Sequence, residues 1–360
     1  MLLPEGTIYL GTPKHSSVVK VLEQVYYMER ELSSEAAWEG GSPPAGGAAY
    51  IPTAEAEGLT PRSDKNPGMA TTTETWQHRE IITNGIRMHY VTQGEGPLIV
   101  LLHGFPEFWY SWRHQIPFLA EHGYTVVAPD LRGYNDTEKP HKGYDIPTLV
   151  RDVVGLIRGL RQQRAIIVGH DWGGVLAWAF AINYPEMTER LIVMNAPHPA
   201  SMMRELRTPK QLCKSWYIFA FQIPWLPEYI LGRNHANEIG RILRGAAVQK
   251  SVFQGEVTAK YQQAMSKPGA IKASLSYYRQ LFRRLPLLLL TYRSDKAHIS
   301  VPTLLIWGEQ DIALGIELTT GLERWVDDIE IKRIPDSGHW VQQEKPEMVN
   351  QYILDFLQRQ

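Results

Sequence analysis

The hexapeptide GHDWGG at 169–174 limits the fold of this chain more than any other feature. It follows the apolar run AIIV and precedes a stretch with a helical pattern. A reactive residue two positions from glycine on either side is typical of a nucleophile elbow, a tight strand-to-helix turn whose glycines leave no room for side chains. The sequence therefore predicts that Asp171 is a nucleophile at the carboxyl edge of a sheet.

Short apolar runs indicate the sheet to which this turn belongs. The segment 80–97 reads as two strands joined by a turn at Asn84-Gly85. Continuous apolar runs of the kind found in central parallel strands follow at 97–104, 124–133, 165–174, 191–197, 301–311 and 329–340. Helical patterns lie between some of them, at 147–160 and 316–325. Because strands alternate with helices, the predicted fold class is α/β, with a mostly parallel central sheet flanked by helices.

Two segments differ from this pattern. Residues 197–297 carry no strong strand pattern and are aromatic and helix-like, which predicts an inserted helical cap between core segments 76–196 and 298–360. Residues 1–75 are rich in Gly, Pro, Ala and Ser, which predicts a disordered leader, with Met69 as a possible natural start.

A weakly charged stretch at 215–232 needs a separate interpretation. Pro224, Pro227 and Glu228 interrupt it, and a membrane-spanning helix needs about 20 mostly apolar residues. We therefore predict no transmembrane segment and interpret this stretch as buried or pocket-lining.

Composition narrows the classes of partner. The formal net charge is -1, so the chain as a whole does not have the basic character expected of a nucleic-acid or anionic-membrane partner. Cys213 is the only cysteine, which fits the reducing cytoplasm. The twelve histidines show no metal-ligand spacing, and HExxH and CxxC are absent, so we expect neither a metal nor another cofactor.

Partners for the nucleophile follow it along the chain in the order nucleophile, acid, histidine. Asp311 ends the strand and loop LLIWGEQD, and His339 lies in DSGHW just after the last strand. A histidine there can activate water, and a carboxylate behind it fixes the tautomer and stabilises the imidazolium. Glu309 is a rival acid; we prefer Asp311, which lies further out in the loop, and interpret Glu309 as solvated.

The oxyanion hole is expected in the loop HGFP at 103–106, where the Phe105 N–H can pair with that of Trp172. Pro106 permits a cis peptide bond in this tight turn. We interpret His103 as a buried structural residue bonded to the loop backbone. Glu107 and Trp109 are expected on the rim of the site.

An aspartate at the elbow changes the chemistry that is expected. A carboxylate attacking an ester or amide would form a poor anhydride intermediate, whereas attack on saturated carbon gives an ordinary ester that activated water can hydrolyse. Epoxides and alkyl halides are the fitting substrates. An epoxide releases an alkoxide that needs a proton donor, and the cap offers Tyr217 and Tyr278, although each could equally be core packing.

Several motifs together carry a family resemblance. HGFPEFWYSWR, DLRGYNDTEKP, GHDWGG, FQIPWLPE, YYRQLFR, WGEQD and GHWVQQEKPE occur in this order. Over 76–357 the chain resembles the epoxide hydrolases of the α/β-hydrolase fold, most closely the epoxide hydrolase 3 and 4 branch of vertebrates and its bacterial relatives.

The resemblance implies a soluble hydrolase acting on ether bonds, which converts an epoxide and water to a diol. It implies the following catalytic residues: Asp171 as nucleophile, His339 as base, Asp311 as its acid, and Tyr217 and Tyr278 as proton donors, with Tyr277 an alternative to Tyr278. The predicted substrate pocket is apolar, which favours a lipophilic epoxide. Its residues are His103, Gly104, Pro106, Trp109, Trp216, Phe219, Phe221, Trp225 and Trp340.

Two rival functions remain open. A haloalkane or haloacid dehalogenase would use the same aspartate, although dehalogenases commonly carry Asn or Arg where this chain has Phe105 or Trp172. A non-catalytic scaffold that binds a small ligand would often lack a triad residue, and here all three positions are filled. The oligomeric state does not follow from the sequence.

Overall fold

A computed structural model describes residues 75–291 and 294–359. The predicted leader and Met69 therefore lie outside the described residues, except for Thr75. The described chain is built around an eight-stranded sheet in the order β1-β2-β4-β3-β5-β6-β7-β8. The strands are β1 Gln77–Thr83, β2 Ile86–Gln93, β3 Leu98–Leu102, β4 Thr125–Pro129, β5 Ala165–His170, β6 Thr188–Met194, β7 Thr303–Gly308 and β8 Ile329–Ile334.

The sheet is antiparallel at one edge and parallel elsewhere. β1 and β2 form the predicted hairpin, whose two-residue turn places Asn84 and Gly85 at φ 44° and 77°, as a tight primed turn requires. β2 also runs antiparallel to β4, and the remaining strand pairs are parallel. β3, β5 and β7 are buried along their whole length, as expected of central strands covered on both faces. The α/β fold class is thus confirmed.

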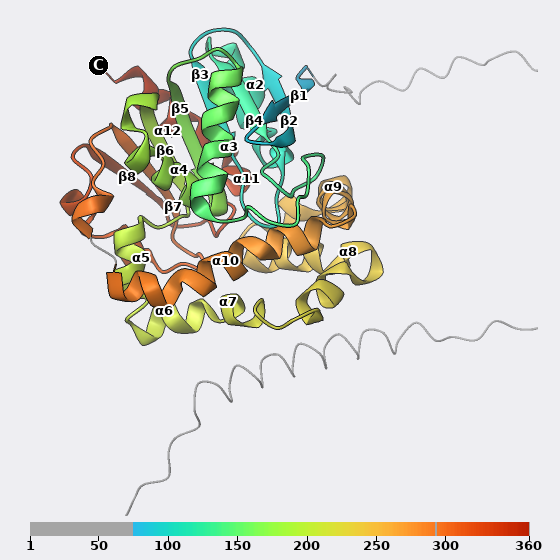
Figure 1. The fold of residues 1–360 in the computed structure, drawn as a ribbon. Helices are drawn as coiled ribbons and strands as arrows, with labels where there is room; N and C mark the ends of the chain where they lie inside the picture. Colours follow the sequence, from blue (N-terminus) through green and yellow to red (C-terminus); the bar gives the residue numbers. More distant parts are fainter. Residues whose placement is uncertain (1–74, 292–293, 360) are drawn as a thin grey trace, which may run out of the picture. The chain divides into compact units, whose positions relative to one another are not determined.

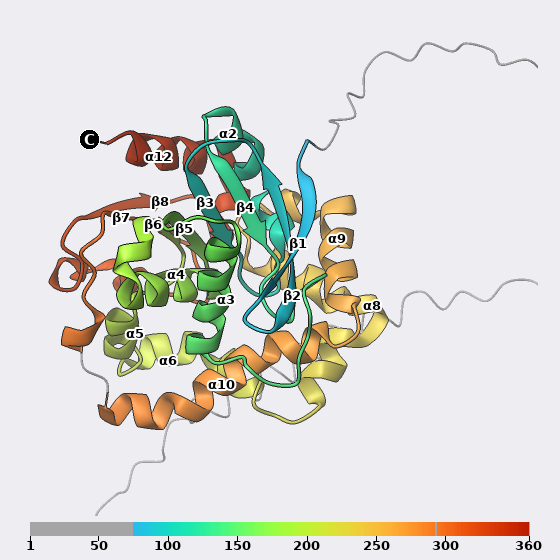
Figure 2. The ribbon, with the colours of Figure 1, turned by 45° about the horizontal axis from the view of Figure 1, so that its top comes forward.

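Helices cover both faces of the sheet (Figures 1 and 2). α3 and α4 lie on one face, and α2 and α12 lie together on the other. α3 begins where Asp145 accepts a hydrogen bond from the Thr148 N–H, an N-cap followed by Pro147. The bounds are α2 Gln115–Glu121, α3 Ile146–Gly159, α4 Trp172–Asn183, α11 Val341–Glu344 and α12 Pro346–Gln358.

One predicted helix is wrong. Residues 316–325 form two short 3-10 turns, Ile316–Thr319 and Leu322–Arg324, in place of one helix. Gly321 between them has φ 68°, a left-handed conformation that ends a helix.

A group of helices follows β6 and precedes β7 in the chain. In space these helices lie along one end of the sheet (Figures 1 and 2). They are α5 Pro199–Glu205, α6 Pro209–Lys214, α7 Trp216–Ala220, α8 Leu226–Ala246, α9 Gly255–Ser266 and α10 Ala270–Thr291. α8 is interrupted at 233–236, where the backbone leaves the helical region. Among the helices that the structure describes, none has both the length and the apolar character needed to cross a bilayer.

Candidate active site

The elbow residue Asp171 lies between β5 and α4 in a strained conformation, with φ 50° and ψ -119°. A positive φ is costly for a residue with a side chain and is held here by its surroundings. Gly173 is required in the first turn of α4, because a Cβ at that position would lie 2.0 Å from the carbonyl oxygen of Leu102. The tight packing of α4 against β3 therefore fixes the direction of the Asp171 side chain.

One carboxylate oxygen of Asp171 is held by the loop after β3. The Phe105 N–H donates to Asp171 Oδ1 at 2.7 Å. Gly104 permits this approach, since a Cβ there would lie 2.4 Å from the Cβ of Asp171. The peptide bond between Phe105 and Pro106 is cis. Trp172, the other predicted oxyanion donor, is the first residue of α4 and directly follows Asp171.

His339 and Asp311 complete a triad-like arrangement. His339 Nδ1 lies 2.7 Å from Asp311 Oδ2, and its Nε2 lies 3.6 Å from Asp171 Oδ2. The first distance is a hydrogen bond and the second is too long for one. Asp311 is only 3% exposed, while the rival Glu309 is exposed. The structure thus brings together the three residues that the sequence selected and leaves Glu309 in solvent.

Charges around His339 favour its protonated form. Burial lowers the pKa of His339, but the neighbouring carboxylates of Asp311 and Asp171 outweigh burial and hold this pKa well above its usual value of 6.5. Burial also raises the pKa of Asp311, yet the His339 imidazole and other donors reverse that shift and leave it lowered. Asp311 is therefore ionised beneath a protonated His339 in the unreacted site.

Asn195, at the end of β6, is a site residue that the sequence analysis missed. Its Nδ2 donates to Asp311 Oδ2 at 2.8 Å, and its Oδ1 accepts from the Gly308 N–H at 2.9 Å. The Ala313 and Leu314 N–H groups donate to the other Asp311 oxygen. The carboxylate is thus held from several sides, which keeps it ionised and aimed at His339.

The expected position of Glu107 and Trp109 is wrong. Glu107 and Trp109 were predicted on the rim, but they are only 1% and 6% exposed. The Glu107 carboxylate accepts from the Gly104 N–H at 2.9 Å and from His170 Nδ1 at 2.7 Å. Gln343 Nε2 donates to its other oxygen at 2.8 Å. Burial raises the pKa of Glu107, but the charge and hydrogen bond of His170, together with the Gly104 N–H, outweigh burial and lower this pKa to about 2.

His170 joins Glu107 to the His339 segment. Its Nδ1 faces the Glu107 carboxylate, and its Nε2 faces the His339 carbonyl oxygen at 2.8 Å. His170 therefore links the Phe105 loop, through the buried Glu107, to the backbone of His339.

His103 is buried, as the sequence predicted, and bonds to backbone. Its Nδ1 lies 2.9 Å from the Gly104 carbonyl oxygen, and its Nε2 accepts from the Leu131 N–H at 3.0 Å. Burial lowers its pKa, so the ring is neutral. With both nitrogens occupied, His103 braces the loop rather than offering a base.

Tyr217 and Tyr278 meet above the elbow. Their ring centroids are 5.9 Å apart, and the Tyr278 ring lies 5.0 Å from that of Trp172 and 5.5 Å from that of Phe105. Burial, followed by the charge of Asp171, raises the pKa of both phenols. Both tyrosines are therefore neutral and retain a proton that they could donate.

Tyr277 has a different partner. Its hydroxyl donates to the Arg132 carbonyl oxygen at 2.8 Å and is fully buried. The Arg132 guanidinium forms a buried ion pair with Asp152, on α3. Tyr277 thus anchors α10 to the core, and its neighbour Tyr278 faces Phe105 and Trp172.

The predicted pocket residues lie at different depths. Phe221 is half-buried, with its ring 5.7 Å from that of Phe105 and 5.0 Å from that of Tyr278. Trp340 is buried, and its ring centroid lies 4.6 Å from that of His339. Trp216 is half-buried, and Trp109 packs on Trp76. Phe219 and Trp225 are 45% and 72% exposed, so any contact that they make with substrate lies at the outer surface of the inserted helices.

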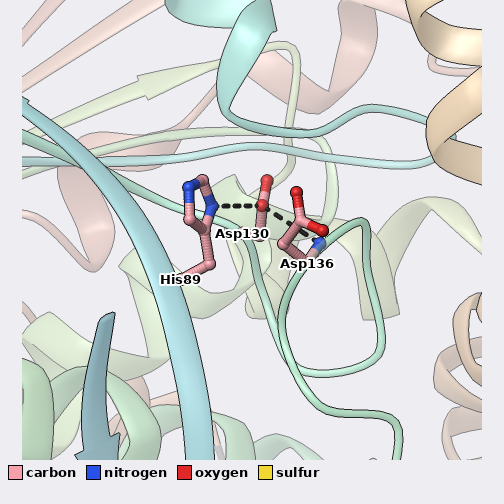
Figure 3. A group of neighbouring side chains, drawn as sticks. All are labelled: His89, Asp130 and Asp136. Carbon is pink, nitrogen blue, oxygen red and sulfur yellow. Dashed lines mark hydrogen bonds and ion pairs between the residues drawn. The ribbon is translucent and has the colours of Figure 1, made fainter. Parts of the chain in front are cut away.

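A cluster of His89, Asp130 and Asp136 offers possible metal ligands (Figure 3). His89 Nδ1 lies 2.6 Å from Asp130 Oδ2, and Asn135 Nδ2 donates to the same oxygen at 2.9 Å. The Trp109 N–H donates to the other Asp130 oxygen at 3.1 Å. Because both oxygens of the buried Asp130 already accept protein hydrogen bonds, this cluster is a network that fixes the loop after β4.

Comparison with known proteins agrees with this architecture. The family model of the alpha/beta hydrolase fold matches residues 97–346, which include strands β3 to β8 and the inserted helices. Epoxide hydrolase 4 from Homo sapiens is 39% identical over 296 residues, 77% of this chain and of that protein. Epoxide hydrolase 3 from Xenopus tropicalis is 41% identical over 285 residues, covering 76% of this chain and 75% of that protein.

Solved structures agree as well. The F128A mutant of an epoxide hydrolase from Bacillus megaterium, complexed with its product (R)-3-[1]naphthyloxy-propane-1,2-diol, has a TM-score of 0.71 and 34% identity. The match covers 78% of this chain and all of that one. An epoxide hydrolase from Vigna radiata has a TM-score of 0.66 and 32% identity, covering 79% and 98%. With sequence and structure matching through both the sheet and the helices above it, this chain belongs to the epoxide hydrolases of the α/β-hydrolase fold.

Proposed function

We propose that this epoxide hydrolase opens a lipophilic epoxide to a vicinal diol through a covalent ester on Asp171. The observation that carries this proposal is the environment of the Asp171 carboxylate. One oxygen accepts the Phe105 N–H at 2.7 Å, and the other faces His339 Nε2 at 3.6 Å. Oδ2, to which no residue in the described part of the chain donates a hydrogen bond, is free to attack carbon, and Oδ1 is positioned to become the ester carbonyl.

In the first half-reaction, Asp171 Oδ2 attacks one ring carbon and the bond from that carbon to the ring oxygen breaks. The alkoxide that leaves takes a proton from Tyr217 or Tyr278. Both phenols are neutral, and the Tyr278 ring lies beside those of Phe105 and Trp172 with the partly buried Tyr217 next to it, which supports this role. Tyr277 already donates to Arg132, which supports Tyr278 as the donor on α10.

In the second half-reaction, His339 takes a proton from water, which attacks the ester carbon of Asp171. The developing charge on Oδ1 is stabilised by the Phe105 N–H and, in our proposal, by that of Trp172. Collapse breaks the bond between the ester carbon and the diol oxygen, and that oxygen takes the proton from His339 as the diol leaves. The proton of the new Asp171 carboxyl group then passes to His339, which restores the carboxylate and the imidazolium. Asp311 stabilises the imidazolium throughout.

Ester formation also prepares His339 to act as a base. In the free site, the carboxylates of Asp311 and Asp171 hold the pKa of His339 well above 6.5. Alkylation removes the charge of Asp171, so the pKa of His339 falls while the ester exists. His339 then gives up its proton, which returns through solvent to the tyrosinate left by the first half-reaction. The neutral histidine is therefore available as a base when there is an ester to hydrolyse.

We further propose that residues 197–297 act as a cap domain that closes the substrate pocket. The cap supplies both tyrosines, and Phe221 brings an aromatic ring next to Phe105 and Tyr278. An apolar pocket suits a lipophilic epoxide, and the Bacillus megaterium relative holds a naphthyl ether diol. The corresponding naphthyl glycidyl ether is therefore a suitable test substrate.

A turnover panel tests the proposal. We expect hydrolysis of 1-naphthyl glycidyl ether, styrene oxide or a fatty-acid epoxide, and none of 1-bromobutane or fluoroacetate. Turnover of the halides alone would assign a dehalogenase. No turnover of any of them, with tight binding of a diol, would assign a ligand-binding scaffold.

We propose the cytoplasm as the compartment. The single cysteine, Cys213, is free and exposed, a state that a reducing compartment maintains. Cell fractionation with an antibody against the chain tests this proposal, and recovery from the secreted fraction would contradict it.

A further inference from the structure

Apolar side chains gather on the outer surface of the cap between α7 and α8. We define the α7–α8 patch as Phe219, Ile223, Trp225 and Tyr229, which are 45%, 46%, 72% and 64% exposed. Nine large apolar side chains in the described chain are exposed to a similar degree, and four of them fall in these eleven positions. Of the two interpretations of 215–232, buried or pocket-lining, the first is therefore wrong for these four residues. A cluster of exposed apolar side chains marks an interaction surface.

Trp225, the most exposed of these residues, has an energetically unfavourable backbone conformation. Trp225 has φ 57°, a left-handed conformation that is unfavourable for a bulky residue. Trp225 is 72% exposed, so burial of its side chain does not compensate this cost. Strain of this kind at a surface residue points to a function outside the folding of the chain itself.

The patch is held in place by α10. Arg279 donates to the carbonyl oxygens of Phe221 and Ile223 at 2.9 and 3.1 Å. The same guanidinium binds both carboxylate oxygens of Glu228, at 2.5 and 3.0 Å. Glu228 is the only acidic residue of 206–237, so the patch contains no unpaired negative charge.

Basic residues predominate in the cap that carries the patch. Residues 197–297 contain sixteen Lys and Arg against five Asp and Glu, whereas 76–196 and 298–360 together contain sixteen against twenty-three. The net charge of -1 conceals this separation. Lys272 and Arg283 are exposed and stand seven and four positions from Arg279, on the face of α10 that meets α7 and α8.

We propose that the α7–α8 patch docks this protein onto an anionic lipid bilayer. Aromatic and aliphatic side chains enter the boundary between headgroups and acyl chains, and the basic residues around them attract anionic headgroups. A nucleic acid would use the basic residues but would leave Ile223 exposed to water. A second copy of this chain could bring its acidic core segments to the basic residues of the cap, but those segments would not cover the apolar side chains of the patch.

Docking at this surface would place the cap where lipophilic compounds accumulate. Phe221 lies between the patch and the site, with its ring 5.7 Å from that of Phe105, whose N–H binds Asp171. The same short segment therefore carries both an exposed apolar surface and a residue that contacts the site. Membrane docking does not depend on the proposed reaction and can be measured without substrate.

Vesicle flotation tests the proposal on the full chain. We expect binding to phosphatidylcholine vesicles with about one third phosphatidylglycerol, much weaker binding to phosphatidylcholine alone, and release by salt. Ile223→Ser/Trp225→Ser should weaken binding about 10-fold, and Lys272→Glu/Arg283→Glu should do the same. Thermal melts show whether each variant folds. If Ile223→Ser/Trp225→Ser does not fold, the charge reversals still test the proposal, because they alter exposed residues only.

Matched controls lie on the core. Ile82→Ser changes a side chain that is 73% exposed on β1, and Lys142→Glu/Arg158→Glu reverses two exposed charges. Neither should alter vesicle binding. Equal binding by the patch variants and wild type, or no binding to the mixed vesicles, would overturn the proposal. Binding of duplex DNA without vesicle binding, or self-association lost in the patch variants, would reassign the surface.

Discussion

His339 Nε2 stands 3.6 Å from Asp171 Oδ2, while His339 Nδ1 is hydrogen-bonded to Asp311 at 2.7 Å. The Asp311 carboxylate thus fixes the orientation of His339 by a hydrogen bond, whereas the Asp171 carboxylate is too far from His339 for one. In the proposed reaction, the site between His339 and Asp171 receives water only after the ester has formed. The two half-reactions therefore depend on different residues and can be separated experimentally.

Replacing His339 should block the second half-reaction and spare the first. In His339→Gln, Asp171 can still attack the epoxide, but no base remains to activate water. We expect the ester to accumulate, and intact-mass analysis should show protein plus epoxide. A mutant that stays unmodified while wild type turns over would refute the covalent mechanism. Asp171→Asn is the matched control and should gain no mass.

Replacing Asp311 should change the pH dependence of ester hydrolysis. Asp311 is the largest contributor that raises the pKa of His339, so Asp311→Asn should lower that pKa. The rising limb of the hydrolysis rate should move to lower pH, since a base becomes active above its pKa. Loss of orientation should slow hydrolysis about 100- to 10,000-fold. Glu309→Gln, at an exposed position, should change neither quantity.

Glu107 should contribute to stability in a defined pH range. Its pKa is lowered from 4.5 to about 2, so its stabilising effect is fully present above pH 4.5 and is lost as the pH falls toward 2. A shift of this size corresponds to about 3 kcal/mol. Glu107→Gln should therefore lower the free energy of unfolding at neutral pH, and its difference from wild type should shrink under acid.

Urea unfolding at several pH values measures that difference. Glu95→Gln alters an exposed carboxylate and should match wild type throughout. A Glu107→Gln deficit that stays constant down to pH 3 would contradict the assignment, because it would show that loss of packing rather than charge is responsible.

The elbow and the order of the triad could be predicted because they depend on local sequence. The strand before Asp171, the glycines after it and the order of Asp311 and His339 are all visible along the chain. The Asn84-Gly85 hairpin was predictable for the same reason. The helix predicted at 316–325 is wrong, because the left-handed Gly321 divides this segment into two short 3-10 turns.

The parts of the site that were missed depend on contacts distant in sequence. Glu107 follows the HGFP loop and looks like a surface residue, but His170 and Gln343 reach it from 63 and 236 positions away. Asn195 ends an apolar run, and its partner Asp311 is 116 positions further on. Neither pairing has a local pattern, so only the assembled sheet reveals it.

The two adjacent tyrosines of α10 allow a matched comparison. Tyr277 donates its hydroxyl to Arg132, and Tyr278 lies against Phe105 and Trp172. Tyr277→Phe removes a buried hydrogen bond and should lower stability by about 1 kcal/mol while leaving the alkylation rate nearly unchanged. Slow alkylation in Tyr277→Phe with normal alkylation in Tyr278→Phe would exchange the two assignments.

Tyr217 and Tyr278 decide between epoxide and halide chemistry. Negative charge builds on the ring oxygen only as the ring opens, so each phenol hydrogen bond strengthens in the transition state and acts on the alkylation rate. Either single Tyr→Phe change should slow alkylation about 10- to 1000-fold, and the double mutant should be folded yet nearly inactive on epoxides. A reactive alkyl halide releases halide without a proton, so residual halide displacement should survive. Pre-steady-state alkylation with both substrates measures this, and undiminished epoxide opening in the double mutant would remove both tyrosines from the mechanism.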